Sequence, residues 1–298
     1  QSGDITIDIL GNQTLNYTGP PLSLGTNTLS IDGAGTLSNA SGSPLVLDQT
    51  DSILDFRGTG IVSGPVKLES GTLKSSGSPT ISGTLTQYNN ATIEVSVDQT
   101  LNYTGPSLSL GASTLSLSGG GAFSNTNSLV LDNAVSKLLL SSITVENVST
   151  SVDNSLGVEV LSDSTINSLS ISNITPVSIA TGKTLSGAIG VTSGSIKLTD
   201  TGTVASTVTM SGGTLDADNS LTVSGALTQS GDITIDVLGN QTLIYTGTPI
   251  SLGSNTLSID GAGTLSNATG SPLVIDQTDS ILDFISTGIV SGPVKLES

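Results

Sequence analysis

An all-β fold, a parallel β-helix (β-solenoid) of about 14 coils of roughly 21 residues with little or no helix, is the fold class that the sequence predicts. Three observations predict it. The first seventy residues recur at the other end of the chain, short segments alternate apolar and polar residues throughout, and Gly-containing turns separate these segments. The recurrence is the strongest of the three, because a long fixed period is typical of repeat architectures.

Two repeats of different length organise the chain. Residues 1–70 align without a gap with residues 229–298, and the two copies differ at nine positions. We call this shift in sequence number, 228, the long period. Residues 12–31 align more weakly with residues 98–117, and we call this shift, 86, the short offset. No linker or change in composition marks a second domain. We therefore expect residues 1–298 to form a single continuous β-solenoid.

Strand-like segments follow one another along the whole sequence. Most alternate apolar and polar residues, which is the period-2 pattern of a strand with one buried face, and no comparable stretch has a 3.6-residue period. In chain order, the expected strands are residues 5–9, 22–24, 28–31, 45–47, 66–68, 92–95, 108–110, 129–131, 158–160, 169–171, 196–198 and 221–223.

Turns separate these strands and set the size of a coil. Gly-containing runs such as residues 32–35 (DGAG) and 42–44 (GSP) are turn sequences. Three segments of strand plus turn make a coil of about 21 residues, and neighbouring coils would hydrogen-bond at about 4.8 Å. The apolar residues are mainly aliphatic, and only 2% of the chain is aromatic. This composition suits a narrow core.

The charge balance is strongly acidic and argues against nucleic acid as a partner. Lys and Arg total 7 against 24 Asp and Glu, for a formal charge of −17, and the cations stand singly. Binding to nucleic acid requires clustered cations that replace phosphate counterions. No run approaches the roughly 18 to 20 apolar residues of a membrane helix, so we expect no membrane span.

Catalytic chemistry has few candidate residues. The chain has no His and no Cys, which removes the commonest general base, the thiol nucleophiles and most transition-metal sites. We expect no enzymatic activity. The alternative is a carbohydrate-active β-helix enzyme of the lyase or glycosidase type, which would need two carboxylates at a defined separation in a cleft.

The densest acidic group is a set of three aspartates that the long repeat contains twice. Three interpretations are open: a calcium site, a catalytic carboxylate pair, or solvated turn residues, where Asp is common. No other cofactor is indicated, and the sequence has no EF-hand loop. The candidates are Asp48, Asp51 and Asp55, with Asp276, Asp279 and Asp283 in the second copy.

Acceptor sequences for N-linked glycans, Asn-x-Ser/Thr, occur at or near the expected turns, where a glycan would be accommodated. Asn16 is replaced by Ile244 in the second copy, so the repeat does not require that acceptor. The candidates are Asn12, Asn16, Asn39, Asn90, Asn102, Asn147, Asn173, Asn240 and Asn267.

Repeats and composition of this kind resemble the β-solenoid stalks of giant tandem-repeat surface proteins, such as filamentous-haemagglutinin-like adhesins and autotransporter passengers. The resemblance covers the whole chain and rests on strand rhythm and composition. It implies a long extracellular rod at the cell surface that spaces, attaches or encases. It assigns no catalytic residue.

We therefore expect a structural extracellular repeat protein that forms a filament, sheath or adhesin stalk by coil stacking and tandem repetition. Open strand edges at the first and last coils would pair with another chain. We expect these ends to continue in a longer chain, to associate with another copy, or both, and cell-surface glycans are a further candidate partner. The long period restarts at Gln229 and is incomplete at Ser298, which favours a longer tandem array.

Overall fold

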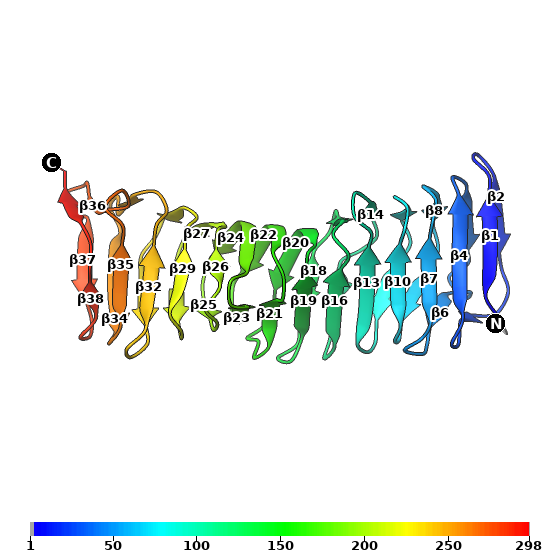
Figure 1. Ribbon diagram of the computed structural model, residues 1–298, viewed down its shortest axis with the longest axis horizontal. Coiled ribbons are helices and arrows are strands. Elements are labelled where there is room, and N and C mark those ends of the chain that lie inside the picture. The colour runs from blue at the N-terminus through cyan, green and yellow to red at the C-terminus, as the bar shows by residue number, and fades with distance from the viewer. Residues whose placement is uncertain (1–2, 298) are drawn as a thin grey trace. The chain divides into compact units, whose positions relative to one another are not determined.

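The computed structural model describes residues 3–297 and confirms the predicted fold class. These residues form 39 β-strands and no helix (Figure 1). The strands stack in parallel, about 21 residues apart, in a β-solenoid of about 14 turns. Within the described residues, no helix is long and apolar enough to span a membrane.

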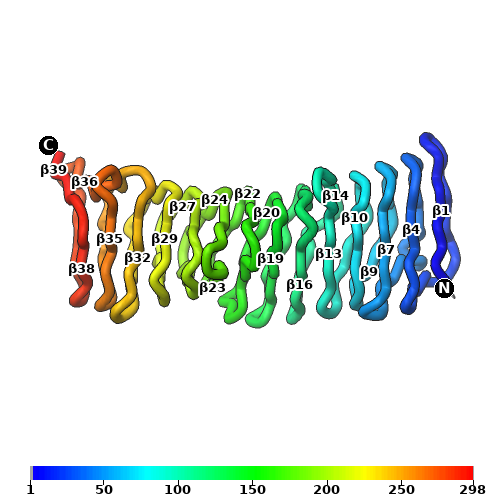
Figure 2. Tube along the Cα trace, in the orientation of Figure 1, coloured from blue at the N-terminus to red at the C-terminus, as the bar shows by residue number. Residues whose placement is uncertain are grey.

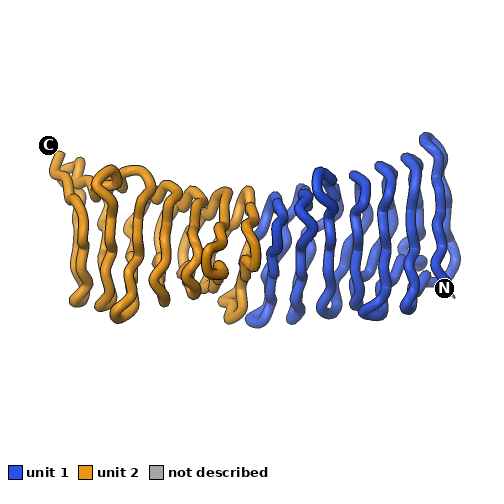
Figure 3. Tube along the Cα trace, viewed as in Figure 1, with its two compact units in different colours: residues 1–148 blue, residues 149–298 orange. Residues whose placement is uncertain are grey.

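Two compact units divide the chain, residues 1–148 and residues 149–298 (Figure 3). The longest sheet has 14 strands, and we call it the first side of the solenoid. Seven of its strands belong to each unit. The division falls within β20 (Thr144–Thr150). That residues 1–298 form one continuous solenoid stays a prediction.

Most turns of unit 1 have three sides, and successive turns can be followed along the trace in Figure 2. The first side consists of β1 (Ile5–Ile9), β4 (Thr28–Gly33), β7 (Ile53–Phe56), β10 (Thr72–Ser75), β13 (Ala91–Val95), β16 (Thr114–Ser118) and β19 (Lys137–Ser141). The other two sides consist of β2 (Thr14–Tyr17), β3 (Leu22–Ser23), β5 (Thr36–Asn39), β6 (Leu45–Leu47), β8 (Ile61–Val62), β9 (Val66–Leu68), β11 (Thr80–Ile81), β12 (Leu85–Gln87), β14 (Thr100–Tyr103), β15 (Leu108–Ser109), β17 (Ala122–Asn125) and β18 (Leu129–Leu131).

Unit 2 begins with longer strands. The ladder between β22 and β24 changes register between Ile166 and Leu169, and β24 then pairs with two successive strands, β26 and β27. The first side consists of β21 (Gly157–Val160), β23 (Ile174–Ile179), β25 (Ser195–Leu198), β28 (Thr214–Ala217), β31 (Ile233–Val237), β34 (Thr256–Gly261) and β37 (Ile281–Phe284). The others are β22 (Ser164–Ile171), β24 (Thr184–Val191), β26 (Thr203–Val204), β27 (Thr207–Met210), β29 (Leu221–Val223), β30 (Leu227–Gln229), β32 (Thr242–Tyr245), β33 (Ile250–Ser251), β35 (Thr264–Asn267), β36 (Leu273–Ile275), β38 (Ile289–Val290) and β39 (Val294–Leu296).

The sequence repeats correspond to whole numbers of turns. Counted along the first-side series, β13 comes four turns after β1, and β31 comes eleven turns after β1. The short offset therefore spans four turns, and the long period spans eleven. Both copies of the long repeat also pair in the same register: the partners on successive first-side strands are Ile5, Leu29 and Leu54 in the first copy, and Ile233, Leu257 and Leu282 in the second.

The core is a set of columns in which equivalent residues of successive turns stack. Leu54, Leu73 and Ile93 are register partners on consecutive first-side strands, and all three are fully buried. Burying an aliphatic side chain of this size stabilises a fold by about 1.5 to 3 kcal/mol. Because alternate residues point inward, the period-2 pattern of the sequence becomes the inner wall of the solenoid.

Glycine is required where the chain leaves the first side. Gly33 has a φ of +83° and its repeat equivalent Gly261 has a φ of +78°. A Cβ at Gly33 would lie 2.2 Å from the carbonyl oxygen of Ile9, and one at Gly261 would lie 2.2 Å from that of Val237. Both the left-handed backbone and the contact with the preceding turn exclude a side chain here.

Candidate functional site

The three aspartates of the first copy lie in different surroundings. Asp48 follows β6, and its carboxylate accepts hydrogen bonds from the Ser23 hydroxyl and, at 2.9 Å, from the Gly25 N–H. Burial alone would raise the pKa of Asp48, but these hydrogen bonds outweigh it, and the pKa lies below its ordinary value. Asp51 is exposed in a turn, whereas Asp55 is buried within β7.

Asp55 has its own partners. Its carboxylate accepts hydrogen bonds from Arg57 Nε at 2.9 Å and from Ser76 Oγ at 2.8 Å. The carboxylates of Asp48 and Asp55 are thus each engaged with their own turn or with a neighbouring one. Across residues 3–297, no three Asp, Glu, His or Cys residues are grouped so that they could hold a metal ion.

The second copy repeats part of this arrangement. A hydrogen bond from the Ser251 hydroxyl lowers the pKa of Asp276, and burial opposes this effect. A second hydrogen bond, from the Gly253 amide, lowers the pKa further. Asp279 and Asp283 are exposed. Ile285 stands where the first copy has an arginine, so Asp283 has no equivalent of the first copy's ion pair.

The nine candidate glycan acceptors differ in the accessibility of their side-chain nitrogen. Asn39 and Asn267 are buried, and the Nδ2 of each donates to two backbone carbonyls, at 2.9 and 3.1 Å. The Nδ2 of Asn147 donates to the Asn125 carbonyl at 2.7 Å. A glycan at these three positions would displace those hydrogen bonds. Asn12, Asn16, Asn90 and Asn240 are exposed, and Asn102 and Asn173 are half-buried.

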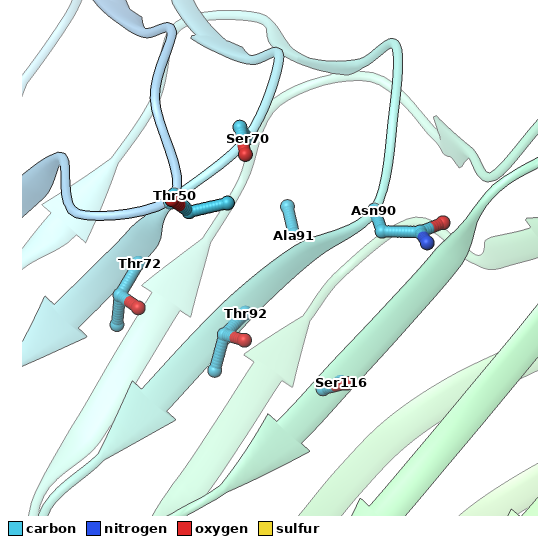
Figure 4. Close-up of a pocket in the computed structure, with 8 residues that line it drawn as sticks. Thr50, Ser70, Thr72, Asn90, Ala91, Thr92 and Ser116 are labelled. Carbon is cyan, nitrogen blue, oxygen red and sulfur yellow. The ribbon is translucent and has the colours of Figure 1, made fainter. Parts of the chain in front are cut away.

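A polar groove of about 170 Å³ lies beside the first side of unit 1 (Figure 4). Thr72 of β10, Thr92 of β13 and Ser116 of β16 line it from neighbouring strands. Its lining carries hydroxyl and amide groups and no charged side chain, so it can hydrogen-bond to a neutral polar molecule such as a sugar. It supplies neither a general acid nor a general base. The rest of the lining is Thr50, Ser70, Gly71, Asn90 and Ala91.

A column of aspartates, which we call the aspartate ladder, runs along the first side of unit 2. Asp216, Asp236 and Asp260 are register partners on β28, β31 and β34. Lys197 on β25 is the register partner of Asp216, and its Nζ lies 3.5 Å from the Oδ2 of Asp216 and 3.4 Å from the Oδ2 of Asp218. Sequence reasoning missed this ladder because its members are separated by a whole turn each.

The aspartate ladder brings like charges together on a partly buried face. Burial first, and then repulsion from Asp218, raise the pKa of Asp216 to about 6 against the attraction of Lys197. Burial, Asp260 and Asp218 raise the pKa of Asp236 in the same way. Hydrogen bonds from the Ser286 hydroxyl and the Gly261 amide lower the pKa of Asp260. Asp216 and Asp236 therefore hold protons more readily than free aspartates would, whereas Asp260 holds its proton less readily.

Replacing Asp216 by Asn is expected to stabilise the protein above pH 6 and to have little effect near pH 4. The pKa of Asp216 is raised from 3.8 to about 6 in the folded chain, so between these two pH values the folded chain binds more protons at this residue than the unfolded chain does. The contribution of Asp216 to stability therefore falls as the pH rises from 3.8 to about 6. Asn cannot ionise and avoids this loss. At pH 7.5 we expect a gain of about 1 kcal/mol, reduced by partial exposure and by the lost attraction of Lys197.

Urea unfolding of Asp216→Asn and of the parent chain at pH 4 and pH 7.5 measures this difference. Asp51→Asn, an exposed turn position outside the ladder, is the matched control and should change stability equally little at both pH values. A variant of Asp216 that is less stable than the parent at pH 7.5 would show that the ion pair with Lys197 outweighs burial and repulsion.

The last turn of unit 2 exposes side chains that are buried in the first copy of the repeat. Phe284 is 49% exposed and Leu296 is 78% exposed. Their equivalents in the first copy, Phe56 and Leu68, are 2% and 0% exposed. In the first copy, the turn β10–β12 covers the apolar face of β7–β9. In β37–β39 the same residues form an exposed apolar face.

No protein-family model matches the chain, and neither a curated protein nor a solved structure matches it. The functional argument therefore rests on the fold, the strand register and the side-chain surroundings described above.

Proposed function

We propose that this chain is a structural segment of an extracellular filament, sheath or adhesin stalk, lengthened by coil stacking and tandem repetition. The agreement between the sequence repeats and the turns carries the proposal: the short offset spans four turns, and the long period spans eleven. A repeat that contains whole turns can be added without a change of register, so repetition adds length. A catalytic role would not require this agreement.

The position of the aspartate ladder and the lining of the polar groove favour a structural role over a carbohydrate-active enzyme. A carboxyl group with a raised pKa, such as that of Asp216, would suit a general acid. However, the ladder lines neither the polar groove nor the two cavities beside the first and last turns. The polar groove in turn has no carboxylate. A net charge of −17 would keep neighbouring filaments apart in solution.

Immunogold electron microscopy of the cells that make the protein, with antibodies raised against residues 1–298, tests the proposal. We expect label along continuous fibres, a sheath or stalks outside the cell. Label confined to discrete particles, or to the cell interior, would contradict it. Release of reducing sugar from a polysaccharide by the purified chain, lost in Asp216→Asn, would favour the enzyme alternative instead.

A further inference from the structure

We propose that the open edge of the last turn, strands β37–β39, binds one further solenoid coil whose sequence matches residues 71–88 of this chain, in the register that unit 1 shows. The inference rests on the proposed function, because it names the partner that coil stacking would place on this edge. Three independent sets of contacts in unit 1 support it.

The apolar contacts are the first set. In unit 1, the turn β7–β9 is covered by β10–β12, and three stacked pairs of inward aliphatic side chains in these turns are at most 2% exposed. The stacked pairs are Leu54 with Leu73, Val62 with Ile81, and Val66 with Leu85. The turn β37–β39 has the same sequence as β7–β9 at every strand position. Its inward surface therefore has the shape and chemistry that residues 71–88 already cover.

The backbone contacts are the second set. In unit 1, the N–H groups of Thr72, Ser76 and Thr80 donate to the carbonyls of Ser52, Phe56 and Gly60 at 2.9, 2.8 and 3.0 Å. The equivalent carbonyls belong to Ser280, Phe284 and Gly288. In the described part of the chain, β37, β38 and β39 pair only with the preceding turn. A parallel edge of this kind recruits an extended segment by strand addition.

The surroundings of Asp55 are the third set, and their charges favour one register. Lys74 is the register partner of Asp55, and Ser76 Oγ lies 2.8 Å from the Asp55 carboxylate. The equivalent Asp283 has lost its arginine to Ile285, so an incoming Lys74 would supply the missing cation. Lys74 is free to do so in an isolated segment, because its partner Glu94 in unit 1, at 3.1 Å, lies outside residues 71–88.

The two substitutions in the last turn do not block this edge. Ser286 replaces Gly58, and its hydroxyl donates to Asp260 of the preceding turn, so the side chain points away from the open edge. Ile285 is 57% exposed and its side chain is uncharged, so it adds no charge that the incoming coil would have to neutralise. The edge therefore accepts the same backbone path as in unit 1.

Fluorescence anisotropy tests the proposal with a labelled synthetic peptide of residues 71–88 and the full 298-residue chain. We expect saturable binding with a stoichiometry of one. A control peptide that carries Leu73→Ser, Ile81→Ser and Leu85→Ser should bind at least about tenfold more weakly, because three buried apolar side chains are lost. Equal binding of the two peptides, or no binding of either, would overturn the proposal.

A charge swap tests the register. Asp283→Lys in the full chain is expected to weaken binding about threefold or more, and a peptide carrying Lys74→Asp should restore it. Asp283 is exposed, so the variant should keep the strand signal of the parent in circular dichroism. A loss that the swapped peptide does not restore would contradict the register. Self-association of the full chain through this edge that the peptide cannot compete away would identify a second copy as the occupant and overturn the proposal.

The outcomes separate this inference from the proposed function. Peptide binding without native fibres would leave the edge proposal standing and contradict the filament. Native fibres without peptide binding would leave the filament standing and contradict the edge proposal.

Discussion

Deletion of residues 18–103 is expected to leave a folded, shorter solenoid, although it removes four strands of the first side. The deletion joins Tyr17 to Thr104 and recreates a natural sequence, because residues 13–19 and 99–105 are identical. It takes out whole turns only, so β1 would stack on β16 as it now stacks on β4. We expect the strand signal in circular dichroism and cooperative urea unfolding to be retained.

A slightly longer deletion is the matched control. Removal of residues 18–113 also takes out β15 and the buried side chains of Leu108 and Leu110, so one turn becomes too short to close. Loss of two buried leucines alone would cost about 4 kcal/mol or more. Urea unfolding of both deletions should therefore differ strongly. Equal stability of the two would show that whole turns are not the unit of this fold.

Tyr103→Ala is expected to lower the free energy of unfolding by about 4 kcal/mol. The ring is fully buried and stacks on Phe123 with the ring centroids 6.3 Å apart. Its hydroxyl oxygen accepts a hydrogen bond from the Leu85 N–H at 3.1 Å, and this buried amide would lose its acceptor. The change combines a large cavity with an unsatisfied polar group, and urea unfolding followed by circular dichroism measures it.

Tyr88→Ala makes the same chemical change at an exposed position. Tyr88 is 54% exposed, and the centroid of its ring lies 5.6 Å from the Lys67 Nζ. We expect a loss of about 1 kcal/mol or less, because an exposed cation–π contact contributes little. Equal losses at the two tyrosines would contradict the placement of Tyr103 in a tightly packed core.

Strand positions were the most predictable part of the fold. The expected strands at residues 45–47, 66–68 and 129–131 coincide with β6, β9 and β18. Alternation reveals such strands because one face of each is buried. The expected strand at residues 169–171 is the second half of β22 (Ser164–Ile171), and the first half was missed because the register shift between Ile166 and Leu169 breaks the two-residue period.

The uniform coil length that the sequence predicts is only an average. Thr28, Ile53 and Thr72 are register partners on three successive first-side strands, and the turn from Thr28 to Ile53 is longer than the turn from Ile53 to Thr72. Insertions in the loops between strands account for such differences, because a loop can lengthen without disturbing the stacked strands on either side of it. Strand rhythm therefore gives the number of turns better than the length of any one turn.

The surroundings of the candidate sites were less predictable, because they depend on register. Lys197, Asp216 and Asp236 are scattered in the sequence, and only the pairing of successive turns aligns them. Asn39 fits a glycan-acceptor sequence, yet it is buried because its amide bridges carbonyls of its own turn and the next. A local motif cannot show which residues a neighbouring turn will cover.

Small-angle X-ray scattering of an extended chain tests the central claim most directly. The extended chain consists of residues 1–298 followed by residues 71–298, so that Ser298 takes the place of Ser70 and one whole long period is added. Eleven further turns at about 4.8 Å each should increase the maximum dimension by about 50 Å with an unchanged cross-section. An increase in cross-section without this gain in length would contradict a solenoid that grows by tandem repetition.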